Sequence, residues 1–79
     1  MNGNQKFIEA NKDKINAILE YKGRDCFFAS EVACLPCFSG VSLQGVIGFL
    51  RRGCDRGVFR RVRGEYRRGH RVWLYCLNF

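Results

Sequence analysis

The chain is organised around residues 42–61, which read SLQGVIGFLRRGCDRGVFRR. Apolar side chains recur there at intervals of three and four residues and would line one side of a helix, namely Val46, Phe49, Leu50 and Cys54. Ser42 is a good helix cap, because its hydroxyl can accept from the free backbone amides of the first turn. Gly57 can take the left-handed conformation that ends a helix and lets the chain turn back. The stretch therefore predicts a capped amphipathic helix followed directly by a basic strand, with one surface shared by both.

Length and composition predict one folded domain, residues 1–79. The chain has 79 residues with 47% hydrophobic content, which allows a single modest core. No apolar run approaches the roughly twenty residues of a membrane span, and the N-terminus, MNGNQKF, lacks the layout of a signal peptide. The five cysteines are an odd number in mostly apolar surroundings, which favours reduced, buried thiols. We therefore expect a cytoplasmic protein without a membrane partner.

The charge is strongly basic and unevenly distributed. The formal net charge is +7, and the excess is arginine in the second half, while the first half is nearly balanced. The clustered residues are Arg51, Arg52, Arg56, Arg60, Arg61, Arg63, Arg67, Arg68 and Arg71. Such segregation is expected of a surface that meets a polyanion. A merely soluble basic surface is the alternative, and the clustering argues against it.

The N-terminal part predicts a long first helix over residues 5–22. Its apolar stripe consists of Phe7, Ile8, Ile15, Ile18 and Leu19. Asn11 lies on the same stripe, and we expect it at the edge of the stripe, in water, because a buried amide would need a hydrogen-bond partner. Gly23 follows as a C-terminal stop.

A short strand and a second helix are expected next. The run CFF at residues 26–28 is too short for a helix and rich in strand-favouring aromatics. Ser30 is expected to cap a helix over residues 31–35, which Pro36 would limit. The chain would then turn into the third helix.

The C-terminal part predicts a hairpin. Residues 58–79 read VFRRVRGEYRRGHRVWLYCLNF, two strand-like runs separated by Gly64 and Gly69 around a polar tip at residues 65–68. Both faces of the second run are apolar, so at least one must pack on the helices. The expected core is Ile8, Ile15, Ile18, Leu19, Phe28, Val32, Val46, Phe49, Leu50 and Trp73.

This order of elements resembles that of winged-helix (winged helix-turn-helix) domains. The resemblance covers nearly the whole chain and is carried by SEVA at residues 30–33, by residues 42–57, and by GVFRR at residues 57–61. The chain is similar to small bacterial winged-helix transcription regulators. The resemblance implies an α+β fold of three helices, a short strand after the first helix and a C-terminal two-stranded wing.

The resemblance also implies binding of double-stranded DNA by a small bacterial or phage transcription regulator. The third helix would lie in the major groove, and the basic wing would follow the backbone or the minor groove. The DNA-binding residues would be Ser42, Leu43, Gln44, Ile47, Arg51, Arg52, Arg60, Arg61, Arg63, Tyr66, Arg67, Arg68, His70 and Arg71. On the helix face, which includes Gly45 and Gly48, only Gln44 and Arg51 can pair with base edges. Interior glycines also weaken the helix, by about one kcal/mol each against alanine.

A protein-interaction module of the same fold is the alternative. Ile47, the glycine-lined helix surface and exposed aromatics would then grip another protein or a second copy of the chain, and the arginines would meet acidic side chains. The dependence of binding affinity on salt concentration distinguishes the two functions. Phosphate binding weakens steeply as salt rises, whereas binding through an apolar interface does not.

Metal binding and catalysis are not expected. Cys34 and Cys37 form CLPC and could be joined by Cys26, but a structural zinc needs four ligands, and the other candidates have no second paired spacing. His70, the sole histidine, has no nucleophile or carboxylate partner near it in the sequence. We therefore expect no cofactor and no enzyme activity.

Overall fold

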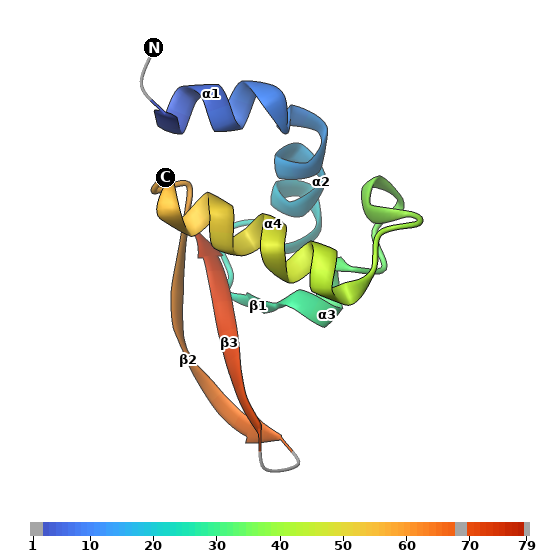
Figure 1. The fold of residues 1–79 in the computed structure, drawn as a ribbon, viewed down its shortest axis with the longest axis vertical. Helices are drawn as coiled ribbons and strands as arrows, with labels where there is room; N and C mark the ends of the chain where they lie inside the picture. The colour runs from blue at the N-terminus through green and yellow to red at the C-terminus, as the bar shows by residue number, and fades with distance from the viewer. Residues whose placement is uncertain (1–2, 68–69, 79) are drawn as a thin grey trace.

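The computed structural model describes residues 3–67 and 70–78, and at residues 3, 4, 65–67, 70 and 71 it describes the backbone alone. The elements are α1 (Gly3–Ala10), α2 (Lys12–Lys22), β1 (Phe27–Phe28), α3 (Ala29–Val32), the 3-10 helix η1 (Pro36–Phe38), α4 (Leu43–Asp55), β2 (Phe59–Arg67) and β3 (His70–Leu77) (Figure 1). The described chain is thus a small α+β domain in which helices precede a three-stranded antiparallel sheet with a C-terminal hairpin. The expected class, short strand and hairpin are confirmed.

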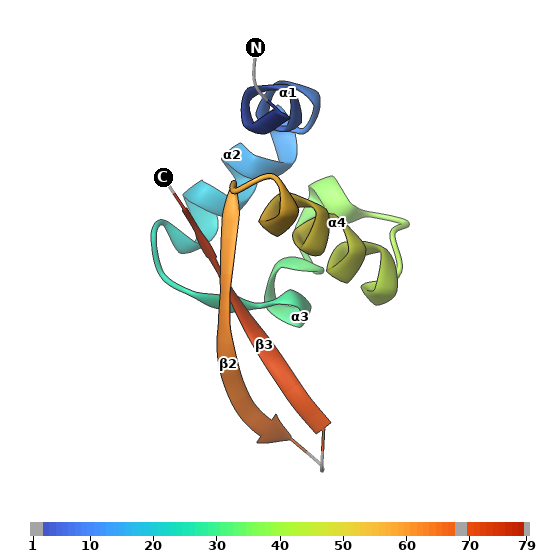
Figure 2. The same ribbon diagram turned by 60° about the vertical axis from the view of Figure 1, so that its left-hand side comes forward.

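The sheet has the strand order β1-β3-β2, so the hairpin is extended by the short strand that follows α2. Phe27 lies opposite Tyr75 on β3, and Phe59 on β2 lies opposite Leu77. The hairpin twists and reaches beyond the helices (Figures 1 and 2). Toward its tip, the hairpin backbone therefore lies away from the helices (Figures 1 and 2).

Gly64 lies inside β2, not at the turn where it was expected. The register of β2 against β3 shifts between Arg63 and Tyr66, which indicates a bulge around Gly64. A Cβ atom at Gly64 would collide with the backbone carbonyl of Val72. Glycine is required there because the two backbones approach closely. Gly69, the other predicted separator, is outside the described residues.

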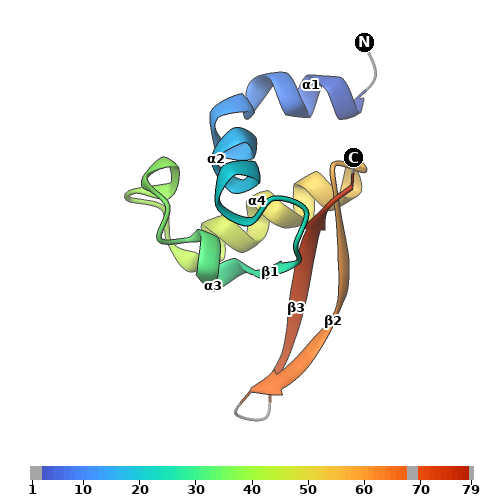
Figure 3. The same cartoon turned by 180° about the vertical axis from the view of Figure 1, so that it is seen from behind.

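The first helix is not continuous, which corrects the expectation of a single helix over residues 5–22. Asn11 has φ −123° and ψ 28°, which ends α1 and separates it from α2. Its side-chain Nδ2 donates to the carbonyl of Phe7 at 3.0 Å, and the side chain is half-buried, so its expected position in water is also wrong. Such a side-chain bond to a helix carbonyl competes with the regular ladder. The break lets α1 lie across the end of α2 (Figures 1 and 3).

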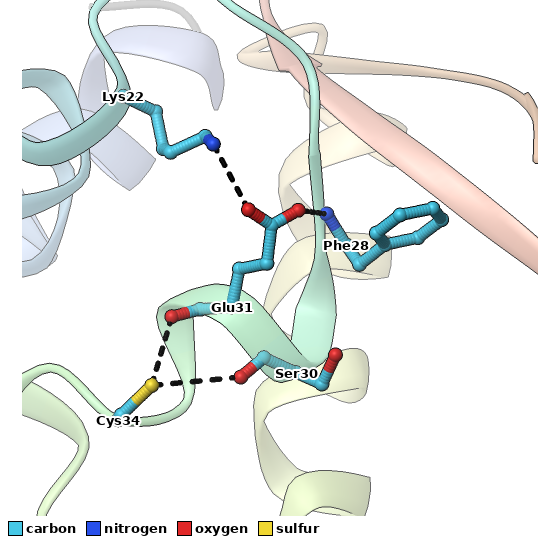
Figure 4. A network of polar contacts seen from close by, with 5 residues as sticks. All are labelled: Lys22, Phe28, Ser30, Glu31 and Cys34. Atoms are coloured by element: carbon cyan, nitrogen blue, oxygen red, sulfur yellow. Dashed lines mark hydrogen bonds and ion pairs between the residues drawn. The ribbon is translucent and has the colours of Figure 1, made fainter.

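The second helix begins earlier than expected and is shorter. α3 starts at Ala29, so Ser30 lies within its first turn and is not the cap. Instead, the Glu31 carboxylate accepts from the backbone N–H of Phe28 at 2.9 Å, which satisfies a donor at the helix start. The same carboxylate pairs with Lys22 Nζ at 2.9 Å (Figure 4). This hydrogen bond raises the pKa of Lys22 and ties the end of α2 to α3.

The third predicted helix has the expected start and end. The Ser42 hydroxyl accepts from the backbone N–H of Gly45 at 3.1 Å. The helix α4 runs to Asp55, and Gly57 takes a φ of +77°, in the left-handed region. The chain then enters β2 at Phe59, so helix and strand follow each other directly, as the local sequence signals indicate.

The core lies between the helices and one face of the sheet. Its buried members are Ile15, Ile18, Phe27, Ala29, Val32, Phe38, Val46, Phe49, Leu50, Val58, Phe59, Tyr75 and Leu77. Six of the ten expected core residues are among them, and Ile8 and Trp73 pack against them while half-buried. The prediction that Leu19 belongs to the core is wrong, because this residue is 41% exposed. Phe27 takes the inward position expected for Phe28, because successive strand residues point to opposite faces.

A disulfide joins Cys26 to Cys76, so the expectation that all five cysteines are reduced is wrong for this pair. The pairing register of β1 with β3 explains this disulfide. Because Phe27 lies opposite Tyr75, the preceding Cys26 comes opposite Cys76, and their Cα atoms are 4.3 Å apart. The free cysteines are Cys34, Cys37 and Cys54. Within the described residues, no helix has the length and apolar character needed to cross a membrane.

Candidate nucleic-acid interface

The outer side of α4 carries the helix residues that were expected to meet DNA. Leu43 and Gln44 are exposed in the first turn, and Arg51 and Arg52 are exposed in the last turns. Ile47 is half-buried because it also packs against the core. Ser42 is exposed but its hydroxyl is already engaged as the helix cap. The predicted helix residues therefore share one face, with Ser42 in a structural role.

The net charge of the chain resides in α4 and the hairpin. Residues 42–79 hold nine arginines against two acidic residues, whereas residues 1–41 hold five basic and five acidic residues. Within residues 42–79, the exposed arginines with described side chains are Arg51, Arg52, Arg56, Arg60, Arg61 and Arg63. None of these six forms an ion pair with a described carboxylate, since the ion pair found there joins Lys22 to Glu31. Their charge is therefore free to attract an anionic partner.

The arginines of β2 lie on two faces of the sheet. Phe59 points into the core, so Arg61 and Arg63 share its face, while Arg60 lies on the opposite face. Arg61 pairs with Tyr75 in the strand register, and Arg63 pairs with Trp73. Arg61 and Arg63 therefore share a face of the sheet that excludes Arg60, whereas the surface shared by helix and strand stays a prediction.

The rest of the predicted wing is described only in part. Tyr66 and Arg67 belong to β2, and His70 and Arg71 belong to β3, with Tyr66 opposite Arg71 and Arg67 opposite His70. Their side chains, and Arg68 as a whole, lie outside the described part of the chain. Their expected contacts with DNA remain predictions.

An arginine of β2 lies against an aromatic residue of β3. The Arg61 guanidinium lies over the Trp73 ring, with Cζ 4.5 Å from the ring centroid. Burial raises the pKa of the Tyr75 phenol and Cys54 adds to this, whereas the charges of Arg61 and Arg51 lower it. The charges of Arg51 on α4 and Arg61 on β2 therefore both act on the Tyr75 side chain.

An apolar groove of about 340 Å³ lies between β1, α3, the start of α4 and β3. Its lining consists of Phe28, Ala29, Ser30, Leu43, Ile47, Val72, Trp73 and Tyr75. The sequence predicted Leu43 and Ile47 as contact residues but missed the groove, because its lining comes from three separate segments of the chain. Arg56, exposed at the end of α4, was also absent from the expected DNA-binding set.

The cysteines do not assemble a metal centre in the described structure. Cys26 is bonded to Cys76 and cannot join Cys34 and Cys37 as a thiolate ligand. The Cys34 thiol is exposed and donates to the backbone carbonyls of Ser30 and Glu31, at 3.7 and 3.1 Å (Figure 4). Burial raises the pKa of the Cys37 thiol, which disfavours the thiolate that a metal needs. Among the described residues, no group of three or more potential ligands could hold an ion.

No family model, curated protein or solved structure matches this chain. The chain provides exposed arginines on α4 and β2 that pair with no described carboxylate, two helix side chains able to pair with bases, and an apolar groove between α3, α4 and β3. Together they form a surface suited to a polyanion that also carries apolar groups.

Proposed function

We propose that this chain is a winged-helix domain that binds double-stranded DNA through α4 and the hairpin, as a small transcription regulator of a bacterium or phage. The observation that carries the proposal is the position of the charge. The exposed arginines of α4 and β2 lie free of described carboxylates, beside a half of the chain with no net charge. Each arginine that neutralises a phosphate releases counterions, which drives binding at low salt.

The order of the elements supports the winged-helix interpretation. α3 and η1 precede α4 as a helix-turn-helix would require, and β2 and β3 follow α4 directly as a wing would. In such domains the helix of the α4 position enters the major groove. The hairpin reaches beyond the helices, so it is long enough to contact DNA beside the helix (Figure 2).

Base recognition by α4 would rest on few side chains. Gln44 and Arg51 are exposed and carry donors suited to base edges, whereas Gly45 and Gly48 have no side chain to offer. Phosphate contacts therefore dominate, and the domain binds duplexes of different sequence with similar affinity. Gln44→Ala is expected to narrow any gap between preferred and random DNA.

Duplex binding is tested by fluorescence anisotropy at several salt concentrations between about 50 and 200 mM. Arg51→Ala and Arg63→Ala should each weaken binding and flatten the plot of log affinity against log salt by up to about one unit, because each removes a phosphate contact. Arg24→Ala is the matched control, since it removes the same charge from an exposed site between α2 and β1. Arg60→Ala should have a smaller effect than Arg63→Ala, because Arg60 lies on the other face of the sheet.

Two results would contradict the proposal. Equal losses for Arg24→Ala and Arg63→Ala would show that only the total charge matters. Failure of the parent protein to bind any duplex at low salt would exclude DNA and leave the protein-interaction module, with another protein or a second copy as its partner.

A further inference from the structure

We propose that the groove between α3, α4 and β3 receives an unpaired base of a DNA strand, so that the preferred ligand is a duplex that contains an unpaired base. This inference rests on the proposed function, because the same arginine surface must hold the strand. DNA with an unpaired base is a different class of ligand from the fully paired duplex of the proposed function.

The lining of the groove suits a flat apolar ring. Three of its eight residues are aromatic, namely Phe28, Trp73 and Tyr75. Leu43, at its edge, is 48% exposed, so the groove is open to a ligand that approaches along α4. Its volume of about 340 Å³ is at the small end of the roughly 300 to 1,000 Å³ of ligand pockets. Bases stack on such aromatic side chains without regard to sequence.

The groove also offers polar groups for the edge of a base. Ser30 and Tyr75 each place a hydroxyl-bearing side chain in an otherwise apolar lining. A few polar groups among apolar ones are typical of sites that orient a ring. None of the lining residues is acidic, so the groove does not repel a phosphate.

The charge around the groove indicates that the ring belongs to an anion. Arg61 lies over Trp73, and Arg63 is the strand partner of Trp73, so two cations border the aromatic lining. Further exposed arginines at positions 51 and 52 follow along α4. A base within a strand has a phosphate on each side, and both phosphates would meet these charges. A free nucleoside monophosphate has a single phosphate and would use fewer of the arginines. The arrangement therefore favours a base within a strand.

An unpaired base as ligand also agrees with the small number of base-reading side chains on α4. Gln44 and Arg51 are its only side chains suited to base edges in an intact duplex. A stacked base is recognised by its ring face, which needs no such donors. The domain would thus recognise a distortion in DNA more strongly than a sequence.

Intrinsic fluorescence gives a direct test, because Trp73 is the sole tryptophan of the chain and lines the groove. The unmodified protein is titrated with a paired duplex, with the same duplex carrying one unpaired thymine, and with free thymidine monophosphate. The unpaired thymine should quench Trp73 and raise affinity at least about fivefold over the paired duplex. The free nucleotide should give no comparable quenching at the same concentrations.

Ser30→Phe should remove the preference by filling the groove, since Ser30 is exposed, lines the groove and is not among the residues assigned to duplex binding. Ser39→Phe is the matched control, because it places the same side chain at an exposed serine outside the groove lining. Paired-duplex affinity should remain within about twofold in both variants. The titration of the unmodified protein decides the matter if either variant fails to fold.

Distinct results would overturn the inference. Equal affinity for the paired and unpaired duplexes would refute it while leaving the proposed function intact. Absence of binding to both at low salt would refute the proposed function itself. Equal quenching by free thymidine monophosphate would assign the groove to a nucleotide, and quenching by an acidic phenylalanine-containing peptide but by no DNA would assign it to a protein partner.

Discussion

Two glycines of α4 have the same low helix propensity but different surroundings in the fold. Gly53 is buried, and a Cβ atom there would collide with the ring of Phe59 and approach Phe7 Cε1 to 3.3 Å. Gly48 is half-buried, and its Cβ would meet only the Arg52 guanidinium, at 3.3 Å. The sequence shows that each glycine weakens the helix, but it does not show which one permits the close contact of α4 with β2.

Alanine at the two positions should change stability in opposite directions. Gly53→Ala should lower the free energy of unfolding by about 1 to 3 kcal/mol, because the new methyl group overpacks the core against Phe59. Gly48→Ala should raise it by up to about 1 kcal/mol, since the flexible, exposed end of Arg52 can move aside and alanine favours the helix. Urea denaturation of both variants measures the difference. Similar changes at the two sites would show that α4 does not pack on Phe59 as described.

Elements with local signals were predicted well, and those that depend on distant partners were not. α4 has its cap, its apolar period and its glycine stop within 16 residues, from Ser42 to Gly57. The start of α3 was misplaced because the Glu31 carboxylate, and not the Ser30 hydroxyl, accepts the hydrogen bond at the helix start, from the backbone N–H of Phe28. The pairing of β1 with β3 joins residues far apart in the sequence, so neither its register nor the disulfide was visible. The fold class follows from the order of elements, whereas the strand register follows from packing.

The disulfide between β1 and β3 predicts the number of reactive thiols. In protein that is denatured without reductant, three cysteines should react with an alkylating reagent, and five should react after reduction. Reduction should also lower the free energy of unfolding by about 4 kcal/mol, because the bond closes a loop of about 50 residues in the unfolded chain. Mass spectrometry counts the labels, and five labels before reduction would show that the bond does not form.

The number of reactive cysteines also tests the expected cytoplasmic location. Stable disulfides are typical of oxidising compartments and rare in the cytosol. Three labels in protein quenched with acid directly from cells would therefore argue against the cytoplasm. Five labels in cells and three after exposure to air would agree with a cytoplasmic protein whose cysteine pair oxidises later.

At the scale of the whole molecule, the sequence indicates a basic surface but not its shape. The segregation of arginines is visible in the order of residues, and so is the proximity of α4 to the hairpin. Arg60 and Arg61 lie on opposite faces of β2, and which of them lies on the helix side of the sheet depends on the fact that Phe59 points into the core. The groove forms only when α3 and α4 pack against β3. No single segment contributes enough of the lining for the groove to be recognised from the sequence.

The central claim is that DNA meets α4 and the hairpin rather than the helices at the N-terminus. It is tested most directly by two-dimensional NMR of the 15N-labelled protein during titration with a paired duplex at low salt. We predict the largest amide shifts for residues 42–56 of α4 and its ends and for Arg61 and Arg63 of β2, small shifts throughout α1 and α2, and reversal on addition of salt. Absence of shifts at low salt, or shifts concentrated in α1 and α2, would contradict the account.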